Sequence, residues 1–174
     1  GKRIDAIART WCDRYNLSIM PKELERHIQH RVVTLIEEQG QAMPGLYELL
    51  EYFKQKKMHI GLATSSNYPI IDAVMVKLGI RHFFDHICSA DDEQYGKPHP
   101  AVYLTAAQKL GVTPQQCLVI EDSLTGLIAA KAATMTTFLV SHEHQHPKFA
   151  FADAHMNGLL DVIQTLGVIE YQRF

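Results

Sequence analysis

Hydrophobic and polar positions follow two alternating patterns along most of this chain. Short apolar runs predict strands over residues 58–64, 83–89, 117–120 and 136–140. Apolar residues recur at helical spacing between these runs, which predicts helices over 46–53, 71–78, 100–110, 124–133 and 159–166. Gly79, Gly111 and Gly167 are expected to end three of these helices. The alternation predicts an α/β fold, a doubly wound parallel sheet with helices on both faces.

Residues 1–40 follow a different pattern, with helical spacing and no strand candidate. The two apolar stripes are Ile4, Ile7, Ala8 and Trp11, then Leu24, Ile28, Val32 and Leu35. Pro21 suits the first turn of the second helix, and Trp11 is expected in the core of the pair. A polar linker follows at 37–44. We therefore expect two parts, a helical segment at 1–40 and an α/β core domain at 41–174.

Composition excludes several classes of function. The 174 residues include 17 basic and 19 acidic side chains, for a net charge of −2. This balance gives no electrostatic support for binding nucleic acid or an anionic membrane. No apolar run approaches the ~20 residues that span a bilayer. Cys12, Cys88 and Cys117 are widely spaced and expected to be free thiols, which indicates a reducing, cytoplasmic compartment.

Polar clusters follow three of the predicted strands, at the sheet edge where parallel α/β folds bind ligands. The first cluster is Thr64-Ser65-Ser66-Asn67, three hydroxyls and an amide between a strand and a helix. Hydroxyls and free backbone N–H groups at a helix N-terminus suit a phosphate group. The alternative is simple capping of the following helix, which Ser and Thr favour for its own sake.

The second cluster contains Lys97, in the loop Gly96-Lys97-Pro98-His99-Pro100. One glycine and two prolines fix the backbone around this lysine. A lysine held in this way can neutralise a phosphate or a group of carboxylates. The alternative is a solvated loop lysine, which is the common environment of this residue type.

The third cluster is Glu121-Asp122, directly after the buried run at 117–120. Adjacent carboxylates repel each other unless they share a proton or a cation, and Mg²⁺ is the hard ion that oxygen ligands suit. Alternatively, one carboxylate caps the next helix with Ser123 while the other faces water. An anion site, a fixed cation and a carboxylate pair at strand ends of one sheet together indicate phosphoryl transfer.

The order of these residues resembles the haloacid dehalogenase-like (HAD) phosphohydrolase superfamily. The similar stretches are Leu62-Ala63-Thr64-Ser65-Ser66, Lys97-Pro98-His99-Pro100 and Ile120-Glu121-Asp122-Ser123-Leu124-Thr125-Gly126. They look like the branch that holds β-phosphoglucomutase and hexose- or hexitol-phosphate phosphatases. The resemblance extends across nearly the whole chain, and it makes residues 1–40 the rear part of an α-helical cap on a HAD-like, Rossmannoid core.

The resemblance implies Mg²⁺-dependent transfer through an aspartyl-phosphate, with a small phosphorylated metabolite as the substrate. It implies that Thr64 binds the transferring phosphoryl group, helped by the backbone at Ser65. Lys97 would neutralise that group and the nucleophile. Glu121 and Asp122 would hold Mg²⁺, directly or through water.

Two further expectations come from the resemblance. Arg3 is similar to a cap arginine that contacts the distal part of a sugar phosphate. The family's first motif, Asp-x-Asp-Gly, supplies the nucleophile, a Mg²⁺ ligand and the general acid/base, but no Asp-x-Asp occurs in the 174 residues. We expect that motif on a central strand upstream of Gly1, between the strands ending at Thr64 and Glu121. Without it two strand edges stay unpaired, so the upstream segment or another chain is expected to pair there.

Three functions remain open at this stage. The first is a phosphatase of sugar or polyol monophosphates. The second is a β-phosphoglucomutase-type mutase, which returns the phosphoryl group to the substrate. The third is a non-catalytic domain that binds a phosphorylated ligand, because these residues alone lack a nucleophile and are expected to be inactive.

Overall fold

The computed structural model describes residues 2–171 of the chain. Its helices are α1 (Ile4–Tyr15), α2 (Pro21–Gln39), α3 (Leu46–Gln55), α4 (Tyr68–Leu78), α5 (Ala101–Leu110), α6 (Leu124–Ala132) and α7 (Leu159–Tyr171). Its strands are β1 (Gly61–Thr64), β2 (His86–Ser89), β3 (Leu118–Glu121), β4 (Thr136–Val140) and β5 (Ala154–Met156). None of these helices is long and apolar enough to cross a membrane.

The described strands form two parallel sheets instead of one. β1 pairs with β2, with Gly61 opposite His86, and the second sheet has the order β3-β4-β5. Leu118 lies opposite Thr136 in that sheet, and Phe138 lies opposite Ala154. β1 and β3 form no ladder with each other in residues 2–171. Each therefore has one edge without a strand partner.

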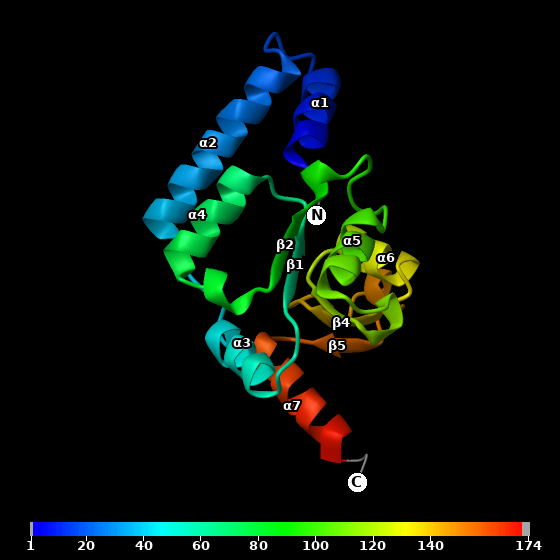
Figure 1. Ribbon diagram of the computed structural model, residues 1–174. Helices are drawn as coiled ribbons and strands as arrows, with labels where there is room; N and C mark the ends of the chain where they lie inside the picture. The colour runs from blue at the N-terminus through cyan, green and yellow to red at the C-terminus, as the bar shows by residue number, and fades with distance from the viewer. Residues whose placement is uncertain (1, 172–174) are drawn as a thin grey trace.

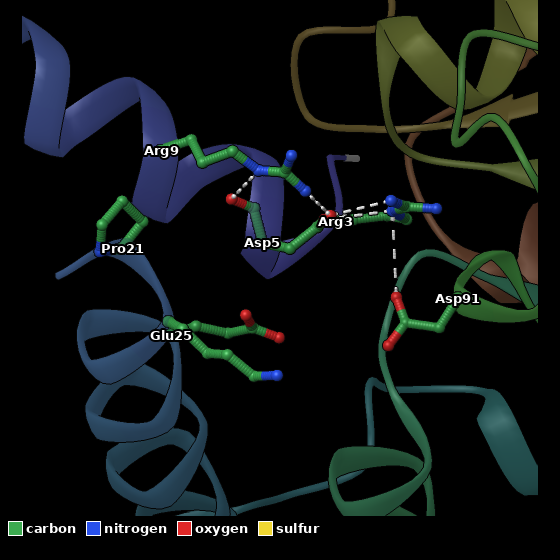
Figure 2. Close-up of a pocket in the computed structure, with 7 residues that line it drawn as sticks. Arg3, Asp5, Arg9, Pro21, Glu25 and Asp91 are labelled. Carbon is green, nitrogen blue, oxygen red and sulfur yellow. Dashed lines mark hydrogen bonds and ion pairs between the residues drawn. The ribbon is translucent and has the colours of Figure 1, made fainter.

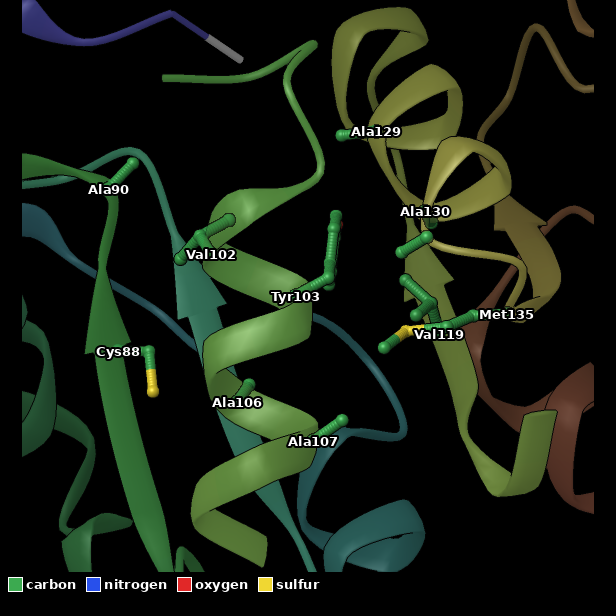
Figure 3. Packing of buried hydrophobic residues seen from close by; sticks show 11 residues of the cluster. Cys88, Ala90, Val102, Tyr103, Ala106, Ala107, Val119, Ala129, Ala130 and Met135 are labelled. Carbon is green, nitrogen blue, oxygen red and sulfur yellow. The ribbon is translucent and has the colours of Figure 1, made fainter. Parts of the chain in front are cut away.

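Helices hold the two sheets together where strand pairing does not. On one side, Leu46 and Phe53 of α3 pack against the apolar residues of both sheets. On the other side, α5 lies between β2 and β3, so that Cys88, Val102 and Val119 share one buried cluster (Figure 3). Figure 1 shows this arrangement, with α5 and α6 on one side and α3 and α7 on the other. The prediction of an α/β fold with parallel strands and helices on both faces is confirmed.

The helical segment packs beside the core and has little core of its own. α1 packs on α2, which in turn packs on α4 (Figure 1). α1 buries only Ala8 and Cys12, and α2 buries no residue completely. Trp11 is 46% exposed, so its predicted place in a cap core is wrong. α2 extends to Gln39 and includes part of the expected linker, while the division near residue 40 stays a prediction.

Two predicted strands are shorter than their apolar runs. β1 starts at Gly61 because the N–H of Ile60 bonds the Asp85 carboxylate (2.8 Å) and not a neighbouring strand. β2 starts at His86, because Arg81–Phe83 form a 3-10 turn that places Phe83 in the core. In both cases a local hydrogen bond or turn takes the place of the strand pairing that the apolar run predicts.

Glycine ended two of the three expected helices. Gly79 and Gly111 adopt left-handed backbone conformations (φ 65° and 71°) and close α4 and α5 as predicted. Gly167 lies inside α7, which continues to Tyr171. Gly79 and Gly111 end their helices because their backbones turn left-handed, whereas a glycine that stays within a helix, such as Gly167, is tolerated at a cost of about 1 kcal/mol.

Candidate active site

A groove of about 430 Å³ lies between the open edges of β1 and β3, at their carboxyl ends. Its lining consists of Lys2, Ile4, Met43, Leu46, Leu62, Ala63, Thr64, Ser65, Ser66, Lys97, Ile120, Glu121, Asp122, Ser123, Val140 and Leu159. The groove is apolar along the strands and polar at its mouth. All the predicted site residues line it except Asn67 and Arg3. The structure thus brings the three strand-end clusters together, as parallel strands require.

The hydroxyl loop begins where β1 ends. The Thr64 hydroxyl oxygen accepts a hydrogen bond from the N–H of Ser66 (3.1 Å), which leaves its own proton free to donate. The Ser66 carbonyl accepts from the hydroxyl of Ser89 on β2 (2.8 Å). These bonds fix the loop against the neighbouring strand, with Thr64 facing the groove.

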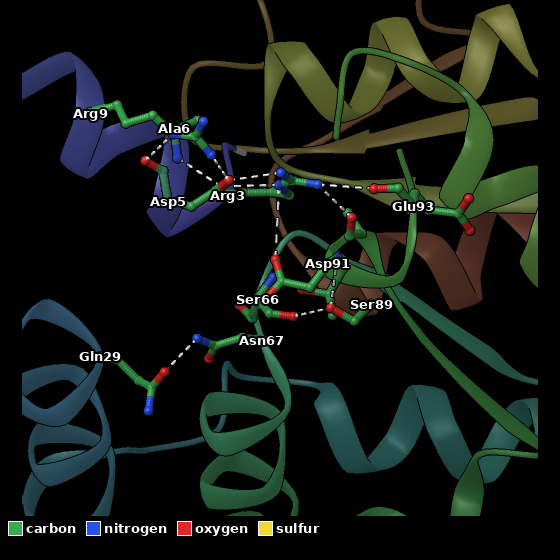
Figure 4. Close-up of polar contacts among 12 residues, drawn as sticks. Arg3, Asp5, Ala6, Arg9, Gln29, Ser66, Asn67, Ser89, Asp91 and Glu93 are labelled. Atoms are coloured by element: carbon green, nitrogen blue, oxygen red, sulfur yellow. Dashed lines mark hydrogen bonds and ion pairs between the residues drawn. The ribbon is translucent and has the colours of Figure 1, made fainter. Parts of the chain in front are cut away.

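Asn67 is the N-cap residue of α4, but its side chain makes no capping hydrogen bond. Its amide instead donates to Gln29 on α2 (2.7 Å), across the boundary between helical segment and core (Figure 4). The side chain is 9% exposed and does not line the groove. Asn67 thus joins the helical segment to the core, and its role as a phosphate ligand stays a prediction.

Lys97 bridges the two sheets at the centre of the site. Its Nζ donates to the Ala63 carbonyl on β1 (3.1 Å), to the Tyr103 hydroxyl (2.9 Å) and to Oε1 of Glu121 at the end of β3. These acceptors engage all three protons of the ammonium group. The side chains of Lys97 and Glu121 are 5% and 8% exposed. The alternative of a solvated loop lysine is therefore wrong.

Glu121 has both carboxylate oxygens engaged. Oε1 accepts from Lys97 and from the Tyr103 hydroxyl (2.6 Å), while Oε2 accepts from the backbone N–H groups of Asp122 and Ser123 (both 3.1 Å) and the Ser123 hydroxyl (2.9 Å). Burial acts to raise the pKa of Glu121, but the charge and hydrogen bond of Lys97 and the Tyr103 bond outweigh it. The pKa lies below its ordinary value, so Glu121 is ionised at neutral pH.

The predicted helix cap after the carboxylate pair is also present. The Ser123 hydroxyl oxygen accepts from the N–H of Gly126 (3.0 Å) and caps α6. A Cβ at position 126 would overlap the Glu121 carboxylate, so only glycine fits there. The capping and acidic-site interpretations are therefore compatible, because the α6 N-terminus holds Glu121 while Asp122 remains exposed.

Asp122 is the carboxylate at the groove mouth that is available to a ligand. Its side chain is exposed and receives no hydrogen bond from residues 2–171. Mg²⁺ takes oxygen ligands and keeps several waters, so this carboxylate fits the ion. Glu121 would contribute through water, because its own oxygens are engaged. Within the described residues no group of three or more His, Cys, Asp or Glu could hold a metal ion by itself.

Arg3 lies outside the groove and connects the helical segment to the core (Figure 4). Its guanidinium pairs with Asp5 (2.8 Å) and donates to the carbonyls of Ala90 (3.2 Å) and Glu93 (3.0 Å), beyond β2. Its stem passes Gly96 so closely that a Cβ there would lie 3.0 Å from it. The Arg3 hydrogen bond is the largest cause lowering the pKa of Asp5 to about 2.

A second cavity, of about 490 Å³, surrounds Arg3 between the helical segment and the core. It is lined by Arg3, Asp5, Arg9, Pro21, Lys22, Glu25 and Asp91 (Figure 2). Three cationic and three anionic side chains share this lining. The distal-contact role expected for Arg3 is compatible with this position and stays a prediction.

Sequence reasoning missed Tyr103 and the role of Gly126. Tyr103 belongs to the buried face of α5, and nothing in its spacing separates it from an ordinary core aromatic residue. Burial and the charge of Glu121 raise the pKa of Tyr103, so its hydroxyl is neutral and able to donate. Gly126 belongs to one of the stretches that resemble the family, but its steric contact with Glu121 can be recognised only in the three-dimensional structure.

Parallel strands with a hydroxyl loop, a buried lysine and a carboxylate pair at their carboxyl ends define a Rossmann-like hydrolase core. The chain belongs to the haloacid dehalogenase-like hydrolases, whose family model matches residues 3–134. The predicted family is confirmed.

Two curated relatives come from Escherichia coli. The chain is 37% identical to hexitol phosphatase B over 166 residues. The aligned region covers 93% of this chain and 74% of the relative. It is 32% identical to a fructose-1-phosphate phosphatase, covering 74% of this chain and 68% of the relative. The chain thus spans about three quarters of the length of the first relative and two thirds of the second.

A solved structure of similar architecture is the β-phosphoglucomutase of Clostridium difficile. It superposes with a TM-score of 0.79 at 27% identity, over 94% of this chain and 76% of that one. A hydrolase from Pseudomonas syringae gives a TM-score of 0.80 at 25% identity, over 96% and 79%. The predicted branch of the family, with its phosphatases and mutases, is confirmed by these relatives.

Proposed function

We propose that the complete enzyme is a phosphatase of small phosphorylated metabolites, with a sugar or polyol monophosphate as substrate. The observation that carries this proposal is the single groove that gathers Thr64, Lys97 and Asp122 at adjoining strand ends. The relatives named hexitol phosphatase and fructose-1-phosphate phosphatase support the substrate class.

The described residues supply the phosphoryl-binding half of the reaction. The Thr64 hydroxyl, whose proton is free, donates to a phosphoryl oxygen, and the backbone at Ser65 assists. Lys97, which bridges the ends of β1 and β3, neutralises charge on the transferring group. Asp122, with Glu121 behind it, would hold Mg²⁺ at the groove mouth. The bound ion would neutralise phosphoryl charge and orient the group for in-line attack.

The nucleophile in this proposal is an aspartate outside the 174 residues. It attacks phosphorus to form an aspartyl-phosphate, while the general acid of the same upstream motif gives a proton to the leaving oxygen so that it departs as the alcohol. Water, deprotonated by that group, then hydrolyses the intermediate to phosphate. We place the Asp-x-Asp strand in the groove between β1 and β3. Support comes from the two unpaired edges, from apolar walls that include Leu62 and Ile120, and from the polar mouth at which such a strand would end.

Arg3 is proposed to contact the distal part of the substrate from the charged cavity beside the groove. Its guanidinium bonds Asp5 and two core carbonyls with four of its five N–H groups, which leaves one on Nη2 to donate to substrate as far as the described residues show. Arg9 and Lys22 in the same cavity offer further donors to hydroxyl or anionic groups.

A mutase that returns the phosphoryl group to its substrate is the second candidate. The likeness to β-phosphoglucomutase over 94% of this chain favours it. The two candidates differ in the acceptor of the phosphoryl group, which is water in one and a sugar hydroxyl in the other.

The compartment proposed for either reaction is the cytoplasm. Cys12, Cys88 and Cys117 are all free thiols. Free thiols are the ordinary state in a reducing compartment.

The test is an assay of the full-length protein with Mg²⁺ and a panel of phosphate monoesters. Hexitol phosphates, fructose 1-phosphate and glucose 6-phosphate are each followed for release of inorganic phosphate. β-Glucose 1-phosphate is followed for both phosphate and glucose 6-phosphate. Phosphate release with Mg²⁺ dependence supports the phosphatase, while glucose 6-phosphate without phosphate replaces it with the mutase. If the protein binds a phosphate monoester but forms neither inorganic phosphate nor glucose 6-phosphate, the result would support the non-catalytic function.

A further inference from the structure

The Tyr103 hydroxyl lies between the two charged groups of the site. It accepts from Nζ of Lys97 (2.9 Å) and donates to Oε1 of Glu121 (2.6 Å). Since an ionised carboxylate cannot donate, the direction of the second bond is fixed. The ammonium group also lies 4.6 Å from the centre of the Tyr103 ring. One side chain thus contacts the lysine through its hydroxyl and its ring face.

The ring of Tyr103 is held rigidly by the core. Tyr103 is 5% exposed and belongs to the buried cluster that joins α5 to β3 and α6. Figure 3 shows the ring projecting from α5 on the side of Val119 and Ala130. Because close-packed rings have little freedom to move, the hydroxyl is a fixed point from which a flexible lysine can be held.

Lys97 needs a rigid hydrogen-bond partner such as the Tyr103 hydroxyl. Its long side chain is flexible, and the bond to Glu121 alone does not fix the position of the ammonium group. Glu121 offers Oε1 to both Lys97 and Tyr103, while its Oε2 is engaged by the α6 N-terminus. The third acceptor, the Ala63 carbonyl, makes the longest of the three bonds (3.1 Å) and precedes Thr64 directly. A phosphoryl oxygen at Thr64 can therefore take the proton given to Ala63, while Tyr103 and Glu121 retain the other two.

We propose that Tyr103 is a positioning residue, whose hydroxyl holds the Lys97 ammonium so that one proton can be exchanged to a bound phosphoryl group. The proposal rests on the phosphatase function proposed above. Tyr103 itself does not line the groove in which the substrate is proposed to bind. It acts through Lys97.

The chain offers a matched control in Tyr52. Its hydroxyl is also buried, but it has no hydrogen-bond partner within the described residues. Tyr103→Phe and Tyr52→Phe each remove one buried hydroxyl and keep the ring. Only the first removes bonds to charged groups, one with Lys97 and one with Glu121, and the loss of such a bond corresponds to roughly tenfold or more in binding or rate.

The experiment compares wild type, Tyr103→Phe, Tyr52→Phe, Lys97→Met and the double variant Tyr103→Phe/Lys97→Met in the full-length protein. Circular dichroism checks the fold, and kcat and KM are measured for phosphate release with saturating Mg²⁺. We expect Tyr103→Phe to lower kcat/KM roughly tenfold or more, and Tyr52→Phe to leave it unchanged. In the Lys97→Met background the Tyr103 substitution should cause no further loss, because the group it positions is gone.

Several results would overturn the proposal. One is a kcat/KM for Tyr103→Phe within about twofold of wild type, well below the loss of a charged hydrogen bond. Another is an equal further loss in the Lys97→Met background, since the hydroxyl would then act independently of Lys97. A Tyr103→Phe protein that fails to fold would assign the hydroxyl a structural role instead.

A binding measurement separates this proposal from the function on which it rests. If wild type releases no phosphate, the proposed function fails, and titration calorimetry with inorganic phosphate then decides the role of Tyr103. Phosphate affinity lowered roughly tenfold by Tyr103→Phe, and unchanged by Tyr52→Phe, would support positioning of Lys97 toward an anion. Equal affinities, or no phosphate binding by wild type, would overturn it.

Discussion

The Glu121 carboxylate occupies the space that a side chain at Gly126 would need. A Cβ built at position 126 meets both carboxylate oxygens and their carbon, far inside contact distance. The first turn of α6 therefore closes over Glu121, and this closeness permits the bonds from Ser123 to Oε2. The buried ion pair between Lys97 and Glu121 therefore requires a residue without a side chain at position 126.

Gly126→Ala should therefore destabilise the protein and abolish its activity. The methyl group must displace the Glu121 carboxylate, which separates it from Lys97 in a buried site. Overpacking of this kind costs about 1–3 kcal/mol, and it exceeds the gain of about 1 kcal/mol that alanine normally gives in a helix. Urea unfolding of the full-length protein measures the change in free energy.

Gly167→Ala is the matched control for that substitution. Gly167 also lies within a helix, but a Cβ there would meet nothing within 4 Å among the residues that the structure describes. We expect this variant to be more stable than wild type by up to about 1 kcal/mol. If Gly126→Ala gains stability to the same extent, the steric relationship with Glu121 is refuted.

Asp122→Ala should remove Mg²⁺ binding while leaving the fold intact. The side chain is exposed and receives no hydrogen bond within residues 2–171, so its loss breaks no internal contact. Mg²⁺ should raise the melting temperature of wild type, because a ligand that binds only the folded state stabilises it. The variant should lose this rise together with Mg²⁺-dependent phosphate release. Asp72→Ala, at an exposed site on α4, is the control and should keep both the rise in melting temperature and the phosphate release. If Mg²⁺ still raises the melting temperature of Asp122→Ala, the metal assignment is contradicted.

The parts of the site that the sequence predicted share one geometric cause. Thr64, Lys97 and Glu121 come together because polar residues that follow parallel strands meet at one sheet edge. That rule needs only the strand ends, which apolar runs locate to within a few residues. It does not need the strands to pair directly, and here β1 and β3 do not.

The parts that the sequence could not predict depend on contacts between distant segments. The Tyr103 hydroxyl acquires its role only when α5 lies beside β3, and Asn67 finds Gln29 on α2. β5 (Ala154–Met156) is too short to give a strand pattern and forms through pairing with β4. Gly126 is an exception to this, because the carboxylate that it contacts lies only five residues earlier, but no residue propensity describes that overlap.

Stability at acidic pH should depend on Asp5. Its pKa is lowered from 3.8 to about 2, chiefly by the Arg3 hydrogen bond. Between those values the unfolded chain binds more protons than the folded one, so the free energy of unfolding rises with pH. The contribution is fully present above about pH 4 and is lost as pH falls through about 2.

Asp5→Asn should therefore be less stable than wild type at neutral pH, and the difference should shrink as pH falls below about 4 and close as it falls through about 2. Urea unfolding of both proteins at a series of pH values measures the difference. Because Asp5 is partly exposed, added salt should reduce the effect. Asp13→Asn, which removes an exposed carboxylate from the same helix, is the control for the change in net charge. A gap between wild type and Asp5→Asn that persists unchanged to pH 2 would contradict the Arg3–Asp5 contact.

Residues 1–174 alone should associate with one another instead of remaining monomeric. In the part of the chain that the structure describes, β1 and β3 each present an unpaired edge beside an apolar groove, and such edges pair with other strands. Sedimentation should give a mean mass that rises with concentration above the monomer's 19.7 kDa. A peptide with an apolar strand ending in Asp-x-Asp should suppress this rise, while a scrambled peptide should not. A 19.7 kDa species at every concentration, with one cooperative unfolding transition, would mean that the helices alone suffice to hold the two sheets.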